Sequence, residues 1–551
     1  MKEPRKKPTA PRRKAAPKNS PANVPESTGE LVLDAPEKPK RKRAPRAPKT
    51  ALSDASISRV GLDALLYIPG RIVPAIAQIL TVTVITHYFT VESENIARYD
   101  LTFRFVLFLS TFTFVWLNVG ILRFYSSYNK PSLEPIFFGV MGLLKYVTVC
   151  VGVVIAGLVW AFVPDEWFGV GLYRDLLLSG TTAFVAYSFY ETGLAVLRAK
   201  RKPLVFSMAT TLSAGLRLPL AVAMFTVFGF GISGIFWATA IMYLVAYWLF
   251  IQRHVGSPAL VKSPKAKKLL REILFYGAPI WISQFLNFCL GNADRYFLQA
   301  LPPPQGSTQV GFYAVCSLLV EQPMSLVFQT FALAVFPAVA SVWERRGREA
   351  TEDLVSGVTR LFFLLCIPLM VLLGVLSQPL FAVFARGDAY LAYEAGPLVV
   401  TASFFYGLSY FANYGLHLSR KTHLLLLITI VALAVNIALN WYVIPEYGYK
   451  GAAAVRVASN ILLVLGFAAG GHSYLHWRLQ YGSIARISLA ALAAGAVAYG
   501  LERTLPHNVL TLAIMFGTGG VTYGVLLLAM REVPLSELFR GFAWLRRRRA
   551  A

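Results

Sequence analysis

Four arginines lie inside long apolar stretches of the sequence: Arg71, Arg217, Arg295 and Arg456. An arginine in such a stretch is energetically costly unless it faces a partner or a wet cavity, so it marks a candidate functional site. A guanidinium group can bind two oxygens of an anionic group at once. We therefore predict that these four side chains line a cavity that binds an anionic group. The alternative for each is an ion pair that holds helices together. Arg104 lies near the end of a stretch, where it could instead extend toward water.

Three carboxylates lie in similar apolar surroundings: Glu321, Asp294 and Glu191. A carboxylate in a region of low dielectric could take up and release a proton, or hold sodium, and so respond to an ion gradient. The alternative is a structural ion pair, which Asp294 could form with the neighbouring Arg295.

The four cysteines lie in apolar stretches without the close Cys or His spacing that is typical of a metal site. They are Cys150, Cys289, Cys316 and Cys366. We expect them to pack as small apolar side chains, and we expect neither a metal site nor a cofactor.

The elements that must position these residues are fourteen apolar stretches. Hydrophobic residues make up 56% of the chain and charged residues 15%, and the mean hydropathy is +0.55. Such values are outside the range of a soluble protein. About 20 apolar residues span a bilayer as a helix, which closes its own backbone hydrogen bonds. We predict an all-α polytopic membrane protein with helices near 65–89, 101–124, 141–163, 173–197, 204–228, 232–252, 272–300, 309–337, 358–384, 390–416, 423–444, 451–475, 484–502 and 509–530.

Lys and Arg cluster in every second gap between these stretches, as cytoplasmic loops do under the positive-inside rule. Both termini should therefore face the cytoplasm.

The net charge of +25 follows from this topology and from two basic tails, 1–58 and 532–551, so we expect no nucleic-acid partner. The first tail is rich in Pro, Ala and Lys, and we expect it to be disordered and drawn to anionic lipids; a protein-docking role is the alternative. The basic gaps include Arg123, Lys130 and Lys145; Arg198, Lys200 and Arg201; and Arg253, Lys262 and Lys265.

The chain contains an internal repeat. Residues 228–247 align with 445–464, and Gly231 and Gly234 match Gly448 and Gly451. We expect each pair to form a tight external turn, because such a turn needs the positive φ that glycine tolerates. The repeat predicts two parallel six-helix lobes, followed by two additional helices: 59–255, 256–478 and 479–531.

Two lobes around a central site suggest a transporter that rocks one lobe against the other. A channel or a membrane enzyme would be the alternative. The sequence shows no filter segment of the kind that channels use, and the predicted external loops are too short for a typical membrane glycosyltransferase.

Four stretches carry a resemblance to a known family. They are NADRYFLQ (292–299), VGFYAVCSLL (310–319), FPAVASVWERRG (336–347) and LNWYVIPEYGYKGAAAV (439–455). In their order and spacing they resemble the Wzx-type flippases of lipid-linked oligosaccharides. These form the polysaccharide-transporter branch of the multidrug/oligosaccharidyl-lipid/polysaccharide exporter (MOP) superfamily. The multidrug and toxin extruders and the lipid II flippases share the same plan. The long basic N-terminal tail departs from the family pattern.

The resemblance implies a transporter of the bacterial inner membrane that makes and breaks no bonds. Its substrate would be an undecaprenyl-diphosphate-linked oligosaccharide, moved from the cytoplasmic to the periplasmic leaflet by alternating access. Partners would be the lipid-linked glycan, membrane lipids, a polysaccharide polymerase and a coupling ion, H⁺ or Na⁺. The alternatives are a cation-coupled exporter of small molecules, a lipid II-type flippase, and a non-transporting scaffold of a polysaccharide synthase.

Overall fold

The computed structural model describes residues 69–91, 94–163, 173–256, 263–301 and 306–532. Within these ranges the secondary structure is helical and contains no strands. Residues 58–551 form one compact unit. The predicted N-terminal tail and most of the predicted C-terminal tail lie outside the described residues.

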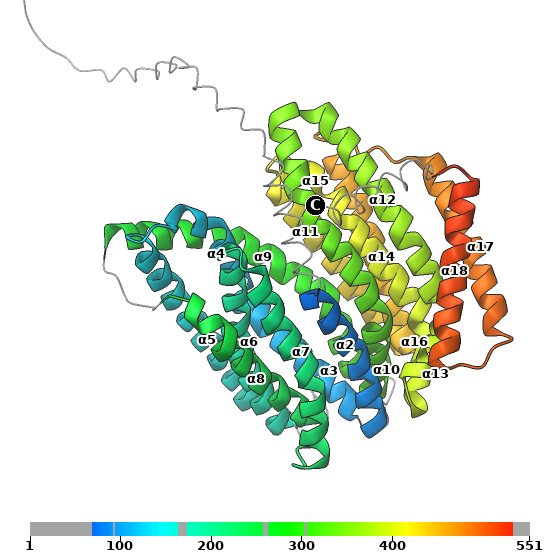
Figure 1. The fold of residues 1–551 in the computed structure, drawn as a ribbon, viewed down its shortest axis with the longest axis horizontal. Coiled ribbons are helices and arrows are strands. Elements are labelled where there is room, and N and C mark those ends of the chain that lie inside the picture. The colour runs from blue at the N-terminus through cyan, green and yellow to red at the C-terminus, as the bar shows by residue number, and fades with distance from the viewer. Residues whose placement is uncertain (1–68, 92–93, 164–172, 257–262, 302–305, 533–551) are drawn as a thin grey trace, which may run out of the picture. The chain divides into compact units, whose positions relative to one another are not determined.

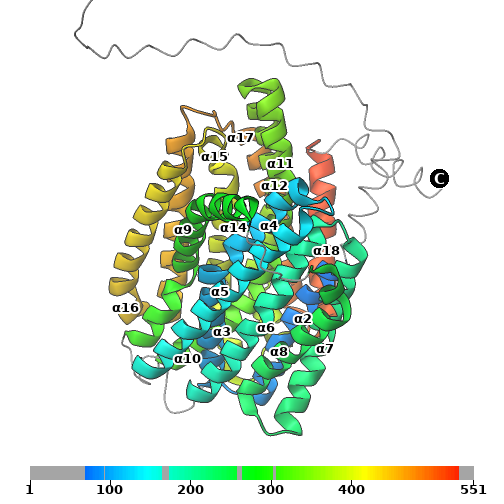
Figure 2. The same cartoon turned by 90° about the vertical axis from the view of Figure 1, so that its left-hand side faces the viewer.

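The described residues of the first predicted lobe form seven α-helices, and three short segments accompany the last of them. Helices α5 to α8 run side by side (Figure 1, Figure 2). The elements are α2 (Pro69–Tyr88), α3 (Asn95–Thr113), α4 (Val115–Tyr128), α5 (Glu134–Phe162), α6 (Tyr173–Ala199), α7 (Pro203–Thr226), the 3₁₀ turn η2 (Gly231–Ser233), α8 (Gly234–Ala246), the π-helical segment η3 (Tyr247–Ile251) and the 3₁₀ turn η4 (Gln252–His254).

The second predicted lobe and the two additional helices complete the fold. Helix α14 packs along α16 and α12, and the α17–α18 pair packs against α12. The elements are α9 (Pro264–Ala300), α10 (Gly306–Cys316), the π-helical segment η5 (Ser317–Glu321), α11 (Gln322–Arg346), α12 (Arg348–Val375), α13 (Ser377–Phe384), the 3₁₀ segment η6 (Gly387–Ala395), α14 (Gly396–Ala412), α15 (Tyr414–Leu418), α16 (Thr422–Gly471), α17 (Tyr481–Glu502) and α18 (Val509–Ala529).

The all-α membrane fold is confirmed, whereas the count of fourteen spans stays a prediction. In the described part of the chain, ten helical runs are long and apolar enough to cross a membrane. Helices α3 and α4 would add an eleventh if they form one span, bent by 42°. The described part of every predicted stretch nevertheless falls on a helix.

Helix α16 is a hairpin of two helices, broken at Gly448. The backbone of this glycine has φ +53° and ψ −137°, which is not helical. Asn436 on the first arm donates a hydrogen bond to Ser459 on the second, at 3.0 Å, so the arms lie antiparallel. Gly231, its partner in the repeat, has φ +54°. The predicted positive φ at both turns is therefore confirmed.

The two lobes meet at the ends of their helices that the charge pattern predicts to be external. Here the backbone N–H of Val91 donates to Asp388 at 3.3 Å, and that of Arg386 donates to Thr86 at 3.2 Å. The helices α3 and α10 lie in contact at this end, at the bottom of Figure 1. A shared apolar core also crosses the junction here. We call this region the external seam.

Helix α9 packs on both lobes. Its first turns bury Leu269 and Ile273 in a core formed with α4 and α5, and its later part packs against α10 and α16. The first part of the predicted second lobe thus contributes to the core of the first lobe.

Candidate functional site

A cavity of about 530 Å³ lies between the lobes, on the cytoplasmic side of the external seam as the charge pattern predicts it. We call it the Arg217 cavity. One wall comes from α2, α6, α7 and α8, and the other comes mainly from α11. Its polar lining residues are Gln78, Tyr190, Glu191, Arg198, Thr210, Ser213, Arg217, Tyr243, Gln322, Ser325 and Gln329.

Arg217 reaches this cavity from the middle of α7 and is half-buried. It lies close to the hydroxyl group of Tyr243 on α8. None of the carboxylates in the described ranges forms an ion pair with it. Glu191 lines the same cavity, but Arg198, about two turns closer to the end of α6, holds it at 3.0 Å. The cavity therefore presents a cation whose charge the described part of the protein does not neutralise.

Arg71 lies in the first turns of α2, and its side chain is outside the described residues. Its neighbours Gly70 and Pro74 line the Arg217 cavity. The location of Arg71 in this cavity stays a prediction.

A second, smaller cavity of about 240 Å³ lies between α3, α9 and α16. We call it the Arg456 cavity. Arg456 makes two parallel hydrogen bonds to Glu321, at 2.9 and 2.6 Å. Arg104 lines the cavity from α3. The remaining polar lining residues, most of them amides, are Thr111, Gln284, Asn287, Asn292, Tyr406 and Asn460.

Arg295 is fully buried in an ion-pair network that joins the lobes. It donates to Asp100 of α3 at 2.9 Å and to Asp294 at 3.2 Å, and it also donates to Ser317 at 2.8 Å. The hydroxyl group of Tyr313 donates to Asp294 at 2.6 Å. Because the side chain of Arg295 is 0% exposed, a ligand in either cavity does not reach it. This geometry corresponds to the structural ion pair that the sequence left open as an alternative for Arg295 and Asp294.

The sequence grouped the candidate residues in a single cavity, whereas the structure distributes them over two cavities and one buried network. Two participants were not among the predicted site residues. Asp100 stands four residues before Arg104 and forms an ion pair with it at 3.2 Å, a spacing that brings side chains together on a helix. Arg198 was assigned to a cytoplasmic gap, although it faces the cavity. The described residues contain no group of side chains arranged to hold a metal ion.

The Arg217 cavity combines hydroxyl, amide and apolar side chains with an arginine that pairs with none of the described carboxylates. An arginine of this kind binds phosphate oxygens well. Hydroxyl and amide side chains can exchange hydrogen bonds with a polyhydroxylated ligand. The arrangement is suited to holding an anionic, hydroxyl-rich group between the two lobes.

Comparisons with known proteins found two family models that match parts of this chain. The family model of a polysaccharide biosynthesis protein matches residues 142–393, and that of the lipid II flippase MurJ matches residues 305–517. A search of curated proteins found no match.

Solved structures with the same fold include three transporters. A lipid II flippase MurJ in an inward closed conformation has a TM-score of 0.66 at 17% identity, covering 86% of this chain and 99% of that one. An inward-facing multidrug resistance MATE transporter has a TM-score of 0.59 at 15% identity, covering 73% of this chain and 94% of that one. A MOP superfamily transporter from Pyrococcus furiosus has a TM-score of 0.54 at 15% identity, covering 76% and 94%. By two family models that each match part of the chain, and by its helical fold, this chain is similar to polysaccharide biosynthesis proteins, to the lipid II flippase MurJ and to transporters of the MOP superfamily.

Proposed function

We propose that this protein is a flippase of the bacterial inner membrane. It moves an undecaprenyl-diphosphate-linked oligosaccharide from the cytoplasmic to the periplasmic leaflet for surface polysaccharide synthesis, and no bond is made or broken. The observation that carries the proposal is the Arg217 cavity, where a cation without a carboxylate partner among the described residues faces hydroxyl and amide groups between two lobes.

The chemistry of the substrate fits this cavity. A diphosphate must be shielded from hydrocarbon. An arginine that faces a water-filled cavity can bind the diphosphate there without the free-energy cost of exposing its own charge to lipid. The prenyl chain stays in the bilayer, so the protein needs to enclose only the diphosphate and the sugars. The match to the polysaccharide biosynthesis model supports a glycan as the cargo.

The closed external seam supports alternating access with the lobes in an inward-facing arrangement. In this state the substrate enters from the cytoplasmic leaflet, and rocking of the lobes opens the seam and closes the cytoplasmic side. The carboxylates Glu321 and Asp294 are paired with Arg456 and Arg295. They would couple the cycle to an ion only if these pairs open in another state.

The first experiment is deletion of the gene in its host, with measurement of surface polysaccharide and of lipid-linked intermediates. The proposal predicts that the polysaccharide is lost, that its undecaprenyl-diphosphate-linked repeat unit accumulates, and that a plasmid copy of the gene reverses both effects. Drug sensitivity with normal polysaccharide would instead show a small-molecule exporter. Loss of polymer without accumulated precursor would show a scaffold.

A lipid II flippase is the second candidate, because the MurJ model matches residues 305–517. Both substrates carry undecaprenyl diphosphate, so the same extraction of lipid-linked intermediates separates the two functions. Accumulated lipid II, with a peptidoglycan defect, would favour this second function over the first.

A further inference from the structure

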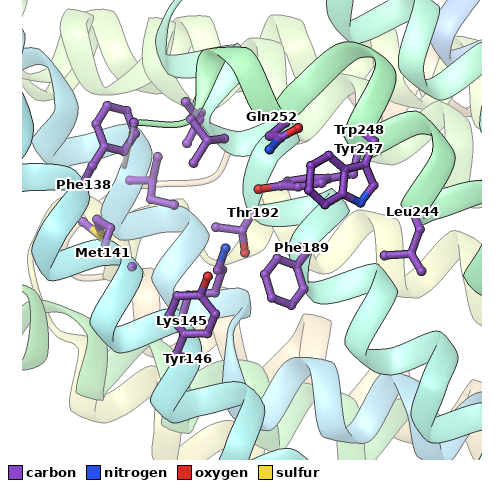
Figure 3. A pocket seen from close by; sticks show the side chains of 15 residues that line it. Phe138, Met141, Lys145, Tyr146, Phe189, Thr192, Leu244, Tyr247, Trp248 and Gln252 are labelled. Atoms are coloured by element: carbon purple, nitrogen blue, oxygen red, sulfur yellow. The ribbon is translucent and has the colours of Figure 1, made fainter. Parts of the chain in front are cut away.

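A third cavity, of about 590 Å³, lies within the first lobe (Figure 3). Its walls come from α4, α5, α6 and α8 with η3 and η4. It contacts the face of α6 that carries Phe189, Thr192 and Val196, whereas the Arg217 cavity contacts the face that carries Tyr190 and Leu194. The two cavities share no lining residue. We call this third cavity the Lys145 pocket.

Lys145 extends into this pocket from α5, and its amino group points toward Thr192 and Phe189 (Figure 3). The residue is only 7% exposed. Its ammonium nitrogen lies 4.0 Å from the centre of the Phe189 ring and 5.1 Å from that of Tyr146. Within the described ranges, no carboxylate forms an ion pair with it. A buried ammonium group with no ion-pair partner among the described residues is energetically costly even beside aromatic rings, and an anionic ligand would lower that cost.

Thr192 supplies a second unsatisfied group. Its hydroxyl oxygen is buried and has no hydrogen-bond partner in the described structure. Other threonines in these helices bond back to a carbonyl one turn earlier, as Thr210 does to Phe206 at 3.0 Å. A buried hydroxyl without a partner costs free energy. A bound acceptor in the pocket would satisfy it together with Lys145.

The local backbone shapes the pocket. Helix α8 continues into a π-helical segment, Tyr247–Ile251, and such segments occur frequently at functional sites. This segment contributes Tyr247 and Trp248 to the wall, and both rings face the pocket (Figure 3). Gly256 at the cytoplasmic end lies so close to Phe138 that a Cβ atom there would overlap the ring.

The pocket opens toward lipid. Trp248 is 62% exposed and Tyr146 is 46% exposed, and both line the mouth. The outer faces of the two flanking helices, α5 and α8, are also exposed and apolar, as are the faces of other membrane-crossing helices. On these faces lie Leu143, Val147, Val151 and Val154 of α5, and Ile241, Leu244 and Val245 of α8.

The pocket lies near one leaflet surface. Lys145 is four residues inside the predicted span 141–163, which corresponds to about 6 Å along a helix. The pocket also includes Gln252 and Val255, next to the basic loop that the charge pattern predicts to be cytoplasmic. We infer that the pocket lies just inside the predicted cytoplasmic surface, where a lysine side chain can reach a lipid phosphate.

We propose that the Lys145 pocket binds an anionic phospholipid of the cytoplasmic leaflet, such as phosphatidylglycerol. Lys145 and Thr192 hold the phosphate oxygens, and the acyl chains lie along the apolar faces of α5 and α8. One buried ammonium group neutralises one phosphate charge. A zwitterionic lipid would add its own ammonium group to the same small site, so an anionic lipid is preferred.

The test is native mass spectrometry of the purified full-length protein, titrated with phosphatidylglycerol, phosphatidylethanolamine, undecaprenyl phosphate or inorganic phosphate. Phosphatidylglycerol should bind best. Lys145→Met, which keeps the stem and removes the charge, should weaken that binding about tenfold or more, and Thr192→Val should weaken it less. The matched control is Lys268→Met, since Lys268 is 76% exposed outside the pocket.

Unchanged phosphatidylglycerol binding in both Lys145→Met and Thr192→Val would overturn the proposal, provided that both proteins unfold at the parent temperature. Equal or tighter binding of phosphatidylethanolamine or undecaprenyl phosphate would overturn it too. So would binding of inorganic phosphate as tight as that of the lipid, because the acyl chains would then contribute nothing. The measurement needs no transport, so its outcome is independent of the proposed flippase function.

Discussion

Arg217 and Arg295 have similar surroundings in the sequence and very different ones in the structure. Arg217 is half-buried in a cavity where none of the described carboxylates pairs with it, whereas Arg295 is fully buried between Asp100 and Asp294. The first is available to a ligand and the second already has its partners. Substitutions at the two positions should therefore separate binding from stability.

Arg217→Ala should abolish most transport while the protein still inserts and folds. Loss of charged hydrogen bonds to a diphosphate should reduce flipping about tenfold or more. The measurement is complementation of the deletion strain, with precursor accumulation as the readout and membrane levels of the protein as a check. Arg503→Ala is the control, since Arg503 is exposed at the end of α17. Parent-level export by Arg217→Ala would remove this residue from the substrate site.

Arg295→Met should destabilise the fold. The substitution leaves the buried carboxylate of Asp294 without a cationic partner and leaves Asp100 with Arg104 alone, and breaking such a network costs about 3–5 kcal/mol. Thermal unfolding of the purified protein should show a large decrease in the midpoint. A double variant, Arg295→Met with Asp294→Asn, should recover part of the loss, because Asp294 then carries no charge and Asp100 keeps Arg104 as its partner. An Arg295→Met protein with parent stability and no transport would instead place Arg295 in the substrate site.

The sequence was informative about which charges lie in the apolar stretches, but not about which of them are paired. Arg217, Arg295 and Arg456 look alike because pairing depends on contacts between distant helices, such as that between Asp100 and Arg295. Lys145 was assigned to a cytoplasmic gap from its basic neighbours. Its burial became visible only once α5, α6 and α8 were packed together.

At the scale of elements, the sequence predicted glycine turns better than irregular helices. Positive φ at Gly231 and Gly448 follows from a repeat that the sequence displays. The bend between α3 and α4 at Phe114 and the two π-helical segments follow no residue pattern that we recognise. They depend on how side chains of neighbouring helices fill the space.

The α17–α18 pair is fastened to the second lobe by Glu532, just beyond the last helix. Arg360 of α12 donates to its carboxylate at 2.8 Å and Arg486 of α17 at 2.6 Å, and Ser483 donates a third hydrogen bond. Burial alone would raise the pKa of Glu532, but the hydrogen bonds from Ser483 and Arg486 and the charge of Arg360 outweigh it and lower the pKa below 4.5.

Because the pKa of Glu532 is lower in the folded protein, its ionised form stabilises the fold. This stabilisation is fully present above the ordinary value of 4.5 and is lost as the pH falls through the lowered folded value. Glu532→Gln should therefore cost about 1–3 kcal/mol at neutral pH, and the difference should shrink in acid. Thermal unfolding at several pH values tests this, with the exposed Glu349→Gln as control. A pH-independent difference would contradict the ionic role.

At the scale of the whole molecule, the external seam must open if the lobes alternate. A Cβ atom built on Gly311 of α10 lies 3.7 Å from the Cβ of Val91, which belongs to the other lobe. That separation is close to the optimum for a disulfide. Gly311 itself permits the close contact with Val91.

The double variant Val91→Cys/Gly311→Cys should therefore form a disulfide that holds the seam closed. Under oxidising conditions, transport should stop while the protein stays folded, and a reductant should restore it. The single variants, with the four native cysteines in place, are the controls. Full transport by the oxidised, cross-linked protein would rule out opening at this seam.

The superfamily plan could be read from the sequence because hydropathy, charge alternation and the repeat each depend on residues close together in the chain. The conformational state could not be predicted from the sequence, because it depends on contacts between distant residues, such as that between Val91 and Asp388. Nor could the sharing of α9 between two cores be predicted, because Leu269 and Ile273 look like any other apolar residues of a membrane helix.

This sharing has a mechanical consequence. The 37-residue helix α9 packs in the cores of both lobes, so the lobes cannot rotate relative to each other unless α9 bends. Pro279 lies between these two packed parts of α9. Because proline has no N–H to complete the helical hydrogen bonding, α9 bends most easily near this residue. If the lobes alternate as we propose, each cycle bends helix α9, and the stiffness of this helix limits how far the lobes move apart.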